Sequence, residues 1–129
     1  MRLRVIAAAA LTGAVATAAA FAHHGWDWAQ EEQTTLEGVI QEIYIGPPHP
    51  TLQVEAEGGS WTIELGNPRR TEDSGFVEGV SQPGDAVTVL GHRTLDPEEL
   101  RMKAVRITID GVNYDPYPER IEDEAQDQG

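Results

Sequence analysis

The sequence contains no cysteine, and it has only nine Lys and Arg residues against 22 Asp and Glu. Without cysteine, the chain can form no disulfide, no thiolate metal site and no cysteine nucleophile. The formal charge of −13 argues against nucleic acid and anionic membrane surfaces as partners, because both would repel it, and it favours cations instead. No hydrolase motif, phosphate-binding loop or dinucleotide site is present, so we expect a binding protein and not an enzyme.

The first residues have the three parts of a secretory signal peptide. Arg2 and Arg4 give a positive start, and residues 5–20 are apolar and rich in alanine. This run is short for a membrane span, which needs about 20 residues. We therefore expect cleavage after Ala20 or after Ala22, and a periplasmic or secreted protein without a membrane span. The leader 1–22 holds two arginines and no acids, so cleavage after Ala22 would leave 107 residues with a charge of −15.

Alternating apolar residues predict five β-strands, at 34–45, 51–56, 61–65, 86–92 and 102–109. We expect Gly38 to mark a bend or bulge in the first strand and a bulge near Val105 in the last. Asn67-Pro68 is a helix start signal, and it predicts a short, imperfect helix over about 68–80.

Three strands, a helix and two more strands are the order of an OB-fold, so we predict an all-β, five-stranded Greek-key barrel with one short helix between the third and fourth strands. A sandwich or an open β-roll would show the same pattern. The predicted regions are a cleaved signal peptide (1–22), an N-terminal arm (23–33), the barrel (34–114) and an acidic disordered tail (115–129).

Four motifs of the chain occur together in a known family. They are His23-His24, Pro48-His49, residues 61–68 with the pattern Trp-x-x-Glu-Leu-Gly-x-Pro, and residues 83–91 with Pro-Gly-Asp-x-Val-x-Val-x-Gly. With them the sequence resembles a family of small uncharacterised secreted or periplasmic bacterial proteins. The family usually has Asn-Pro-His where this chain has Pro47-Pro48-His49. The resemblance implies the compartment and the domain boundaries, and it implies no activity.

The candidate metal ligands are the four histidines of the chain: His23, His24, His49 and His92. Cleavage after Ala22 would make His23 the first residue, so that its amine and imidazole form a chelate ring. Cleavage after Ala20 would place the amine, two backbone amides and the His23 imidazole in a square-planar nitrogen set. Both sets favour copper(II), with nickel(II) next, and zinc could be held by three or four imidazoles.

His49 and His92 lie at the two loops that border the binding face of an OB-fold, so we expect them near each other. The alternative is that the histidines are solvated and bind nothing. Trp26 and Trp28 could dock the arm onto the barrel, or they could contact a periplasmic protein partner.

The sequence thus predicts a soluble periplasmic copper-handling protein that uses its N-terminal and loop histidines. The rival hypothesis is a non-metal module that binds a protein or a small ligand through the loops of the barrel. A copper oxidase with a histidine brace is a third and weaker hypothesis, because so small a barrel offers little room for a substrate.

Overall fold

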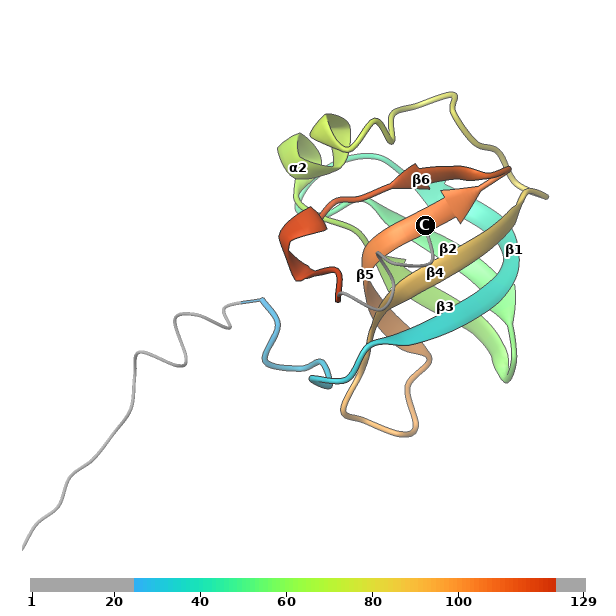
Figure 1. The fold of residues 1–129 in the computed structure, drawn as a ribbon. Helices are drawn as coiled ribbons and strands as arrows, with labels where there is room; N and C mark the ends of the chain where they lie inside the picture. The colour runs from blue at the N-terminus through green and yellow to red at the C-terminus, as the bar shows by residue number, and fades with distance from the viewer. Residues whose placement is uncertain (1–24, 123–129) are drawn as a thin grey trace, which may run out of the picture.

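The computed structural model describes residues 25–122. Its elements are β1 (Thr34–Tyr44), β2 (Thr51–Ala56), β3 (Gly59–Glu64), α2 (Pro68–Asp73), β4 (Ala86–Arg93), β5 (Arg101–Ile109), β6 (Val112–Tyr114) and a 3-10 helix (Pro118–Arg120). The first five strands curl into a barrel, with α2 near one end and the 3-10 helix on the side from which the N-terminal arm approaches (Figure 1).

The long strand β1 joins the two halves of the barrel, since its first part pairs with β4 and its second part pairs with β2. Antiparallel pairs of β2 with β3 and of β4 with β5 continue the sheet in both directions. A parallel pairing of β3 with β5 then closes it. This confirms the predicted OB-like barrel of five strands with its helix between the third and fourth.

The inward residues of the five strands fill one core, in which Leu52, Val54, Ile63, Val89 and Ile107 are completely buried. Phe76, from the connection after α2, closes the core and packs edge-on against Tyr114 of β6 at 5.5 Å between ring centroids. Successive side chains of a strand point to opposite faces. Every second residue of these strands therefore lies on the outside of the barrel, where it contacts solvent or the N- and C-terminal segments.

The helix α2 is shorter than the sequence predicted. Its N-terminus is as expected: the Asn67 side chain accepts a hydrogen bond from the amide of Arg70, with Pro68 at the first helical position. It ends at Asp73 instead of near residue 80, because Ser74 caps it and Gly75 follows at φ +94°, a conformation that favours glycine.

The two predicted irregularities have different outcomes. The bulge at Val105 is confirmed, because Leu90 pairs with Arg106 while the next residue of β4 pairs with Ala104. In β1 the register shifts at Gln41 and not at Gly38. Gly38 has a different role: a Cβ there would lie 2.4 Å from the carbonyl oxygen of Glu55, so only glycine lets β1 and β2 approach this closely.

The chain beyond residue 114 packs against the barrel as far as the structure describes it. β6 forms a hairpin with β5 that the sequence did not predict, and Asp115 receives two hydrogen bonds from Arg106. Ile121 is buried. Residues 115–122 of the predicted disordered tail are therefore folded, and 123–129 lie outside the described residues. Within residues 25–122, no helix has the length and apolarity to cross a membrane.

Candidate functional site

The N-terminal arm, residues 25–33, is held on the barrel by backbone hydrogen bonds. The amide of Gln30 donates to the carbonyl of Arg93 at 2.7 Å, and the amide of Leu95 donates to the carbonyl of Trp28 at 2.8 Å. Ala29 forms a bridge with Thr94 between these bonds. The arm therefore pairs with the end of β4, and its backbone polar groups are satisfied there.

Trp26 and Trp28 fix the arm with their side chains, as one of the two hypotheses for them required. The Trp26 ring stands edge-on to the ring of His92 at 5.3 Å and to that of Tyr117 at 4.8 Å. The guanidinium of Arg101 lies 3.6 Å from the centre of the Trp28 ring. Edge-on aromatic pairs and cation–π contacts of this kind each stabilise by about 0.5–2 kcal/mol, so together they offset part of the entropy cost of ordering the arm.

Both ring nitrogens of His92 are used within the protein. Its Nδ1 lies 2.8 Å from the carbonyl oxygen of Gln30, so this nitrogen carries the proton and donates it. Its Nε2 is then an acceptor and faces the side-chain amide of Gln33 at 3.3 Å, and that amide also donates to the carbonyl of Arg120. His92 is buried and joins the arm, β4 and the C-terminal turn.

The docked arm covers a group of aromatic and cationic side chains on the outer surface of β3 and β5. We call this group the arm cluster, and its members are Trp26, Trp28, Glu64, Arg101, Lys103, Tyr117 and Arg120. Register explains its position: Glu64 pairs with Lys103 across the two strands, and both alternate with inward residues such as Ile63 and Met102. Arm and C-terminal turn thus enclose side chains that strand alternation alone would leave in water.

Lys103 is the most enclosed member of the arm cluster, with 2 % of its surface exposed. Its ammonium lies 5.1 Å from the centre of the Trp26 ring and 5.6 Å from that of Tyr117. Burial lowers the pKa of Lys103, while Glu64 works in the opposite direction and the two neighbouring arginines add to the lowering. Burial likewise raises the pKa of the Tyr117 hydroxyl.

Arg101 and Arg120 occupy opposite situations within the arm cluster. Arg101 donates two hydrogen bonds to one carboxylate oxygen of Glu64, a side chain that is 13 % exposed. Arg120 has its guanidinium 4.0 Å from the centre of the Trp26 ring, and no carboxylate pairs with it among residues 25–122. The described charges of the arm cluster are therefore three cations and one carboxylate.

Of the four predicted metal ligands the structure describes two, His49 and His92, and no described contact joins them. His23 and His24 lie outside the described residues. The hydrogen bonds and ring contacts of His92 involve Gln30, Gln33 and Trp26, and none involves His49. His49 lies beside the junction of β3 and α2, since the amide of Leu65 donates to the carbonyl of Pro50. Within residues 25–122, no three His, Asp or Glu side chains form a group that could hold a metal ion.

The Nδ1 atom of His49 is buried and, in the part of the chain that the structure describes, has no hydrogen-bond partner. This makes His49 different from His92, whose nitrogens are both occupied. The proline-rich loop around His49 is also fastened by its neighbours, as the hydroxyl of Tyr44 donates to the carbonyl of Pro47 at 2.6 Å.

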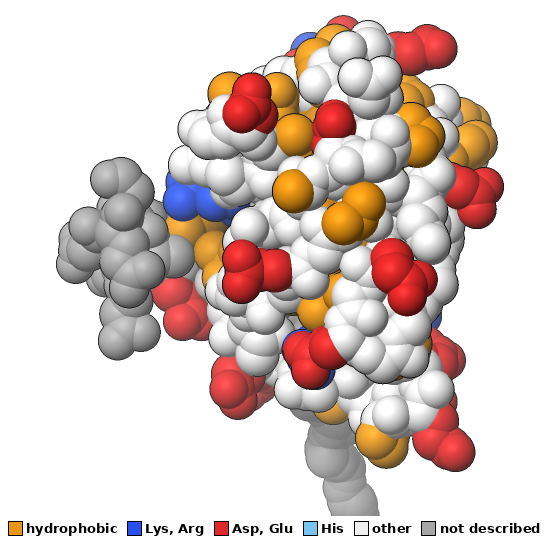
Figure 2. Space-filling model, turned by 90° about the vertical axis from the view of Figure 1, so that its right-hand side faces the viewer, with side chains coloured by type: hydrophobic (Ala, Val, Ile, Leu, Met, Phe, Trp, Pro, Cys, Tyr) orange, Lys and Arg blue, Asp and Glu red, His pale blue; other side chains and the backbone are white. Residues whose placement is uncertain are grey.

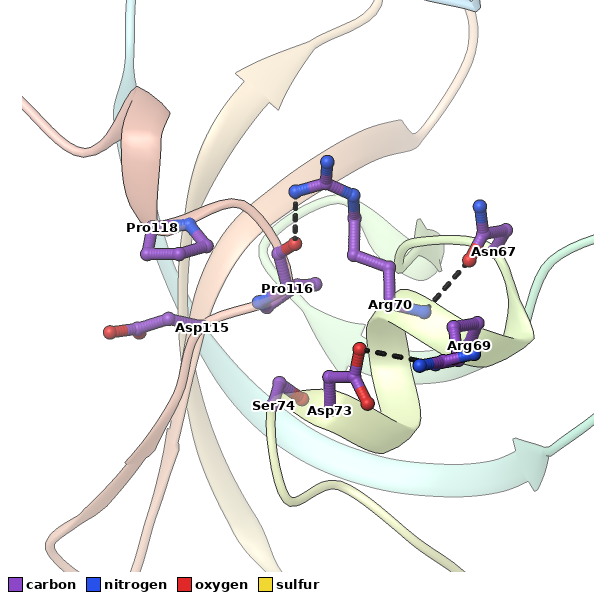
Figure 3. A pocket seen from close by; sticks show the side chains of 8 residues that line it. All are labelled: Asn67, Arg69, Arg70, Asp73, Ser74, Asp115, Pro116 and Pro118. Carbon is purple, nitrogen blue, oxygen red and sulfur yellow. Dashed lines mark hydrogen bonds and ion pairs between the residues drawn. The ribbon is translucent and has the colours of Figure 1, made fainter.

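A polar hollow of about 430 Å³ lies between α2 and residues 115–118 (Figure 3). Its charged side chains already have partners. Arg70 donates to the carbonyl of Pro116 and to Glu119, Arg69 pairs with Asp73 at 3.4 Å, and Asp115 accepts from Arg106. The hollow fastens the C-terminal segment to the helix, and we assign no ligand to it.

Acidic side chains are spread over the face of the barrel shown in Figure 2, where basic side chains are few. Excluding the predicted leader, the sequence has seven basic residues, and three of these belong to the arm cluster. Lys103 is also the only lysine of the chain. Positive charge is therefore concentrated under the arm of an otherwise acidic protein.

Sequence reasoning missed most of the arm cluster. Arg101, Lys103, Tyr117 and Arg120 carry no motif, and the last two fall in the segment predicted to be disordered. The sequence contained one signal for this cluster: its single lysine, Lys103, lies within a predicted strand of a chain with 22 acidic residues. Its burial depends on the path of the arm, which the sequence pattern does not specify.

Comparison with known proteins identifies a family. The model of a family described as "Family of unknown function (DUF6152)" matches residues 11–101. No curated protein matches the sequence. Among solved structures, the crystal structure of the ZRD-deleted mutant of TiaS in complex with agmatine is similar, with 20% identity and a TM-score of 0.49, over 67% of this chain and 27% of that one.

The crystal structure of a tRNA fluorescent labeling enzyme is similar over 60% of this chain and 18% of that one, with 20% identity and a TM-score of 0.47. This chain therefore spans about a quarter of these proteins or less. At these TM-scores the similarities carry no argument about this chain.

Proposed function

The chain belongs to the DUF6152 family, whose function is unknown, and we propose that it is an exported copper-binding protein that holds Cu(II) at its mature amino terminus. If cleavage follows Ala22, the amine and imidazole of His23 form the chelate, and His24 is the next donor. If cleavage follows Ala20, the amine, two backbone amides and the His23 imidazole provide four nitrogens. Nitrogen donors of these kinds bind Cu(II) more strongly than other divalent metals, and nickel or zinc are the alternatives.

The observation that supports this proposal is the docking of the arm immediately after the two histidines. Gly25, which follows His24, is so close to the barrel that a Cβ on it would lie 3.9 Å from the ammonium of Lys103. Trp26 then packs on His92. A terminal chelate needs its first residues held in place, and a docked arm reduces the entropy that binding must still remove.

The charges under the arm favour a chelate built from terminal atoms over one built on the barrel. Arg101, Lys103 and Arg120 would repel a divalent cation placed among them, whereas the overall negative charge of the protein attracts it from solution. Since both nitrogens of His92 are engaged, we assign His92 the role of positioning the arm. His49 remains a candidate donor from another part of the surface.

Calorimetric titration of the exported protein with Cu(II) tests the proposal, after its amino terminus has been sequenced. The control is the same protein with its α-amine acetylated, because an added residue in front of His23-His24 would only create a new chelate. Mass spectrometry verifies that the acetyl group is on the terminal amine. Acetylation can be directed to this amine because the only lysine of the chain, Lys103, is buried.

We expect the free-amine form to bind one Cu(II) and acetylation to weaken binding at least ~100-fold, or about 2.7 kcal/mol. A dissociation constant weaker than ~10 μM for the free-amine form would overturn the proposal. Tight binding that survives acetylation would place the site on internal histidines, and His49→Phe would then be the next variant to titrate.

A further inference from the structure

The enclosed ammonium of Lys103 has an incomplete set of partners. Its neighbours are two aromatic rings, Trp26 and Tyr117, and the carboxylate of Glu64 on the paired strand. Both hydrogen bonds to Glu64 come from Arg101, and no hydrogen bond from Lys103 to a carboxylate is present among residues 25–122. A buried ammonium without a hydrogen-bonded counter-charge is costly, because its hydration has been removed.

Arg120 adds a second unmatched cation to the same place. Its guanidinium lies over the ring of Trp26, against which the ammonium of Lys103 also packs. Arg101, Lys103 and Arg120 carry three positive charges, and the two carboxylates that pair with this group, Glu64 and Glu99, both pair with Arg101. The charges of Lys103 and Arg120 are therefore left without an ion pair among residues 25–122, in a protein whose overall charge is −13.

We infer that Lys103 and Arg120, with Trp26 and Tyr117 as walls, form a binding site for carboxylate groups. The chemistry of the two cations fits this ligand, since a planar guanidinium binds a carboxylate with two parallel hydrogen bonds and an ammonium adds a point charge. The two rings lie next to each other, with centroids 4.8 Å apart, and they exclude water from one side of the ammonium, which strengthens both interactions.

The lowered pKa of Lys103 shows how a second carboxylate would act on it. An opposite charge in contact would raise the pKa of the ammonium, yet its burial dominates over Glu64 in the described structure. The inference does not rest on copper binding, and it gives the non-metal hypothesis a defined ligand class.

Two sources could supply the carboxylate. One is a free carboxylic acid in the surroundings of the protein. The other is the chain itself, because four acids, Glu122, Asp123, Glu124 and Asp127, follow Arg120 within seven residues. Seven extended residues span at most ~25 Å, so the length of the chain allows each of these acids to reach Lys103. The experiment must separate a ligand from this intramolecular competitor.

Nuclear magnetic resonance of the full mature chain, grown with ¹³C-labelled lysine, provides the measurement. The single lysine gives one Cε signal, which reports directly on Lys103. The probe is succinate, a dicarboxylate that matches two cations, and the controls are neutral succinamide and sodium chloride at equal ionic strength. We expect a saturable shift of the Lys103 signal with succinate and none with the controls.

Arg120→Gln should weaken succinate binding at least ~10-fold, since it removes one of the two cations. Arg69→Gln is the matched control and should leave binding unchanged, because Arg69 is exposed on α2 and pairs only with Asp73. Arg120 is only partly buried, so we expect its substitution to leave the protein folded. Urea unfolding of both variants checks this.

A third variant, with Glu122→Gln, Asp123→Asn, Glu124→Gln and Asp127→Asn in the full chain, distinguishes the sources. If the chain's own acids fill the site, this variant will bind succinate at least ~10-fold more tightly and its Lys103 will titrate at lower pH than in the unaltered protein. If the ligand is external, both proteins will bind succinate alike. The inference is overturned if Lys103 responds to succinate in neither protein and titrates at the same pH in both, or if Arg69→Gln and Arg120→Gln behave identically.

Discussion

The indole of Trp26 stands edge-on to the imidazole of His92, with ring centroids 5.3 Å apart and ring planes at 90°. The two residues are 66 positions apart in the sequence, and the contact joins the N-terminal arm to the end of strand β4. Because His92 also hydrogen-bonds Gln30 and Gln33, the arm touches it at three points. One imidazole therefore contacts residues 26, 30 and 33 of the arm and holds the arm on the barrel.

Trp26→Ala should release the arm and destabilise the protein by about 2 kcal/mol. The estimate is below the 3–5 kcal/mol typical of a fully buried tryptophan because this side chain is half-buried. Equilibrium unfolding in urea measures the change, with Asp27→Ala as the control, since Asp27 is exposed between the two tryptophans. Equal stability of the two variants would show that the arm contributes nothing to folding.

His92→Phe separates a structural histidine from a metal ligand. The substitution keeps a ring against Trp26 but removes the donor to the carbonyl of Gln30 and one of the two acceptors of the Gln33 amide, so we expect a loss of about 1–3 kcal/mol in stability. Copper affinity should stay within about twofold, because neither nitrogen is free to bind a metal. A loss of tenfold or more, measured by calorimetry, would instead make His92 a ligand.

The barrel was predictable because each of its elements is signalled by residues that are close together in the sequence. The period of apolar residues gave the five strands, Asn67-Pro68 gave the start of α2, and the break in period near Val105 gave the bulge. Each of these depends on neighbours in the sequence. The length of α2 was overestimated because Gly75 at positive φ ends the helix, and Phe76 then enters the core from a connection that is not helical.

The arm cluster could not be predicted in the same way. Strand alternation correctly puts Lys103 on the outside of the barrel, and it then implies exposure, whereas the residue is buried. Trp26 and Tyr117 bury it, and they come from the two ends of the described chain. The expected proximity of His49 and His92 rested on analogy with other OB-folds, and the ring contacts of His92 are made to the arm instead.

Gly91→Ala should be among the most destabilising changes in the barrel. A Cβ at this position would lie 2.1 Å from the carbonyl oxygen of Lys103, which is backbone and cannot move aside without breaking the pairing of β4 with β5 at the bulge. We expect a loss of about 3 kcal/mol or failure to fold.

Gly79→Ala is the control for Gly91→Ala. Gly79 adopts φ +97°, and a Cβ there meets nothing within 4 Å, so only backbone strain of about 1 kcal/mol opposes the substitution. Urea unfolding of both variants makes the comparison. Equal effects would mean that the bulge can open to admit a methyl group.

The stability of the protein should rise with pH as Lys103 loses its proton. Burial next to Arg101 and Arg120 lowers the pKa of Lys103 below its value of 10.5 in the unfolded chain, and Glu64 offsets only part of this. Between the two values the unfolded chain binds the extra proton, so the free energy of unfolding increases with pH there. Tyr117 acts in the opposite direction above pH 10, since burial raises the pKa of its hydroxyl and the unfolded chain ionises first.

Urea unfolding between pH 7 and 11 tests these two contributions, and variants assign them. Lys103→Met should remove the rise, because an uncharged side chain in the same place binds no proton in either state. Tyr117→Phe should keep the rise and remove the fall above pH 10, while retaining the ring contacts with Trp26. A rise that persists in Lys103→Met would assign it to another group and would show that the ammonium of Lys103 is well solvated or fully paired in the folded protein.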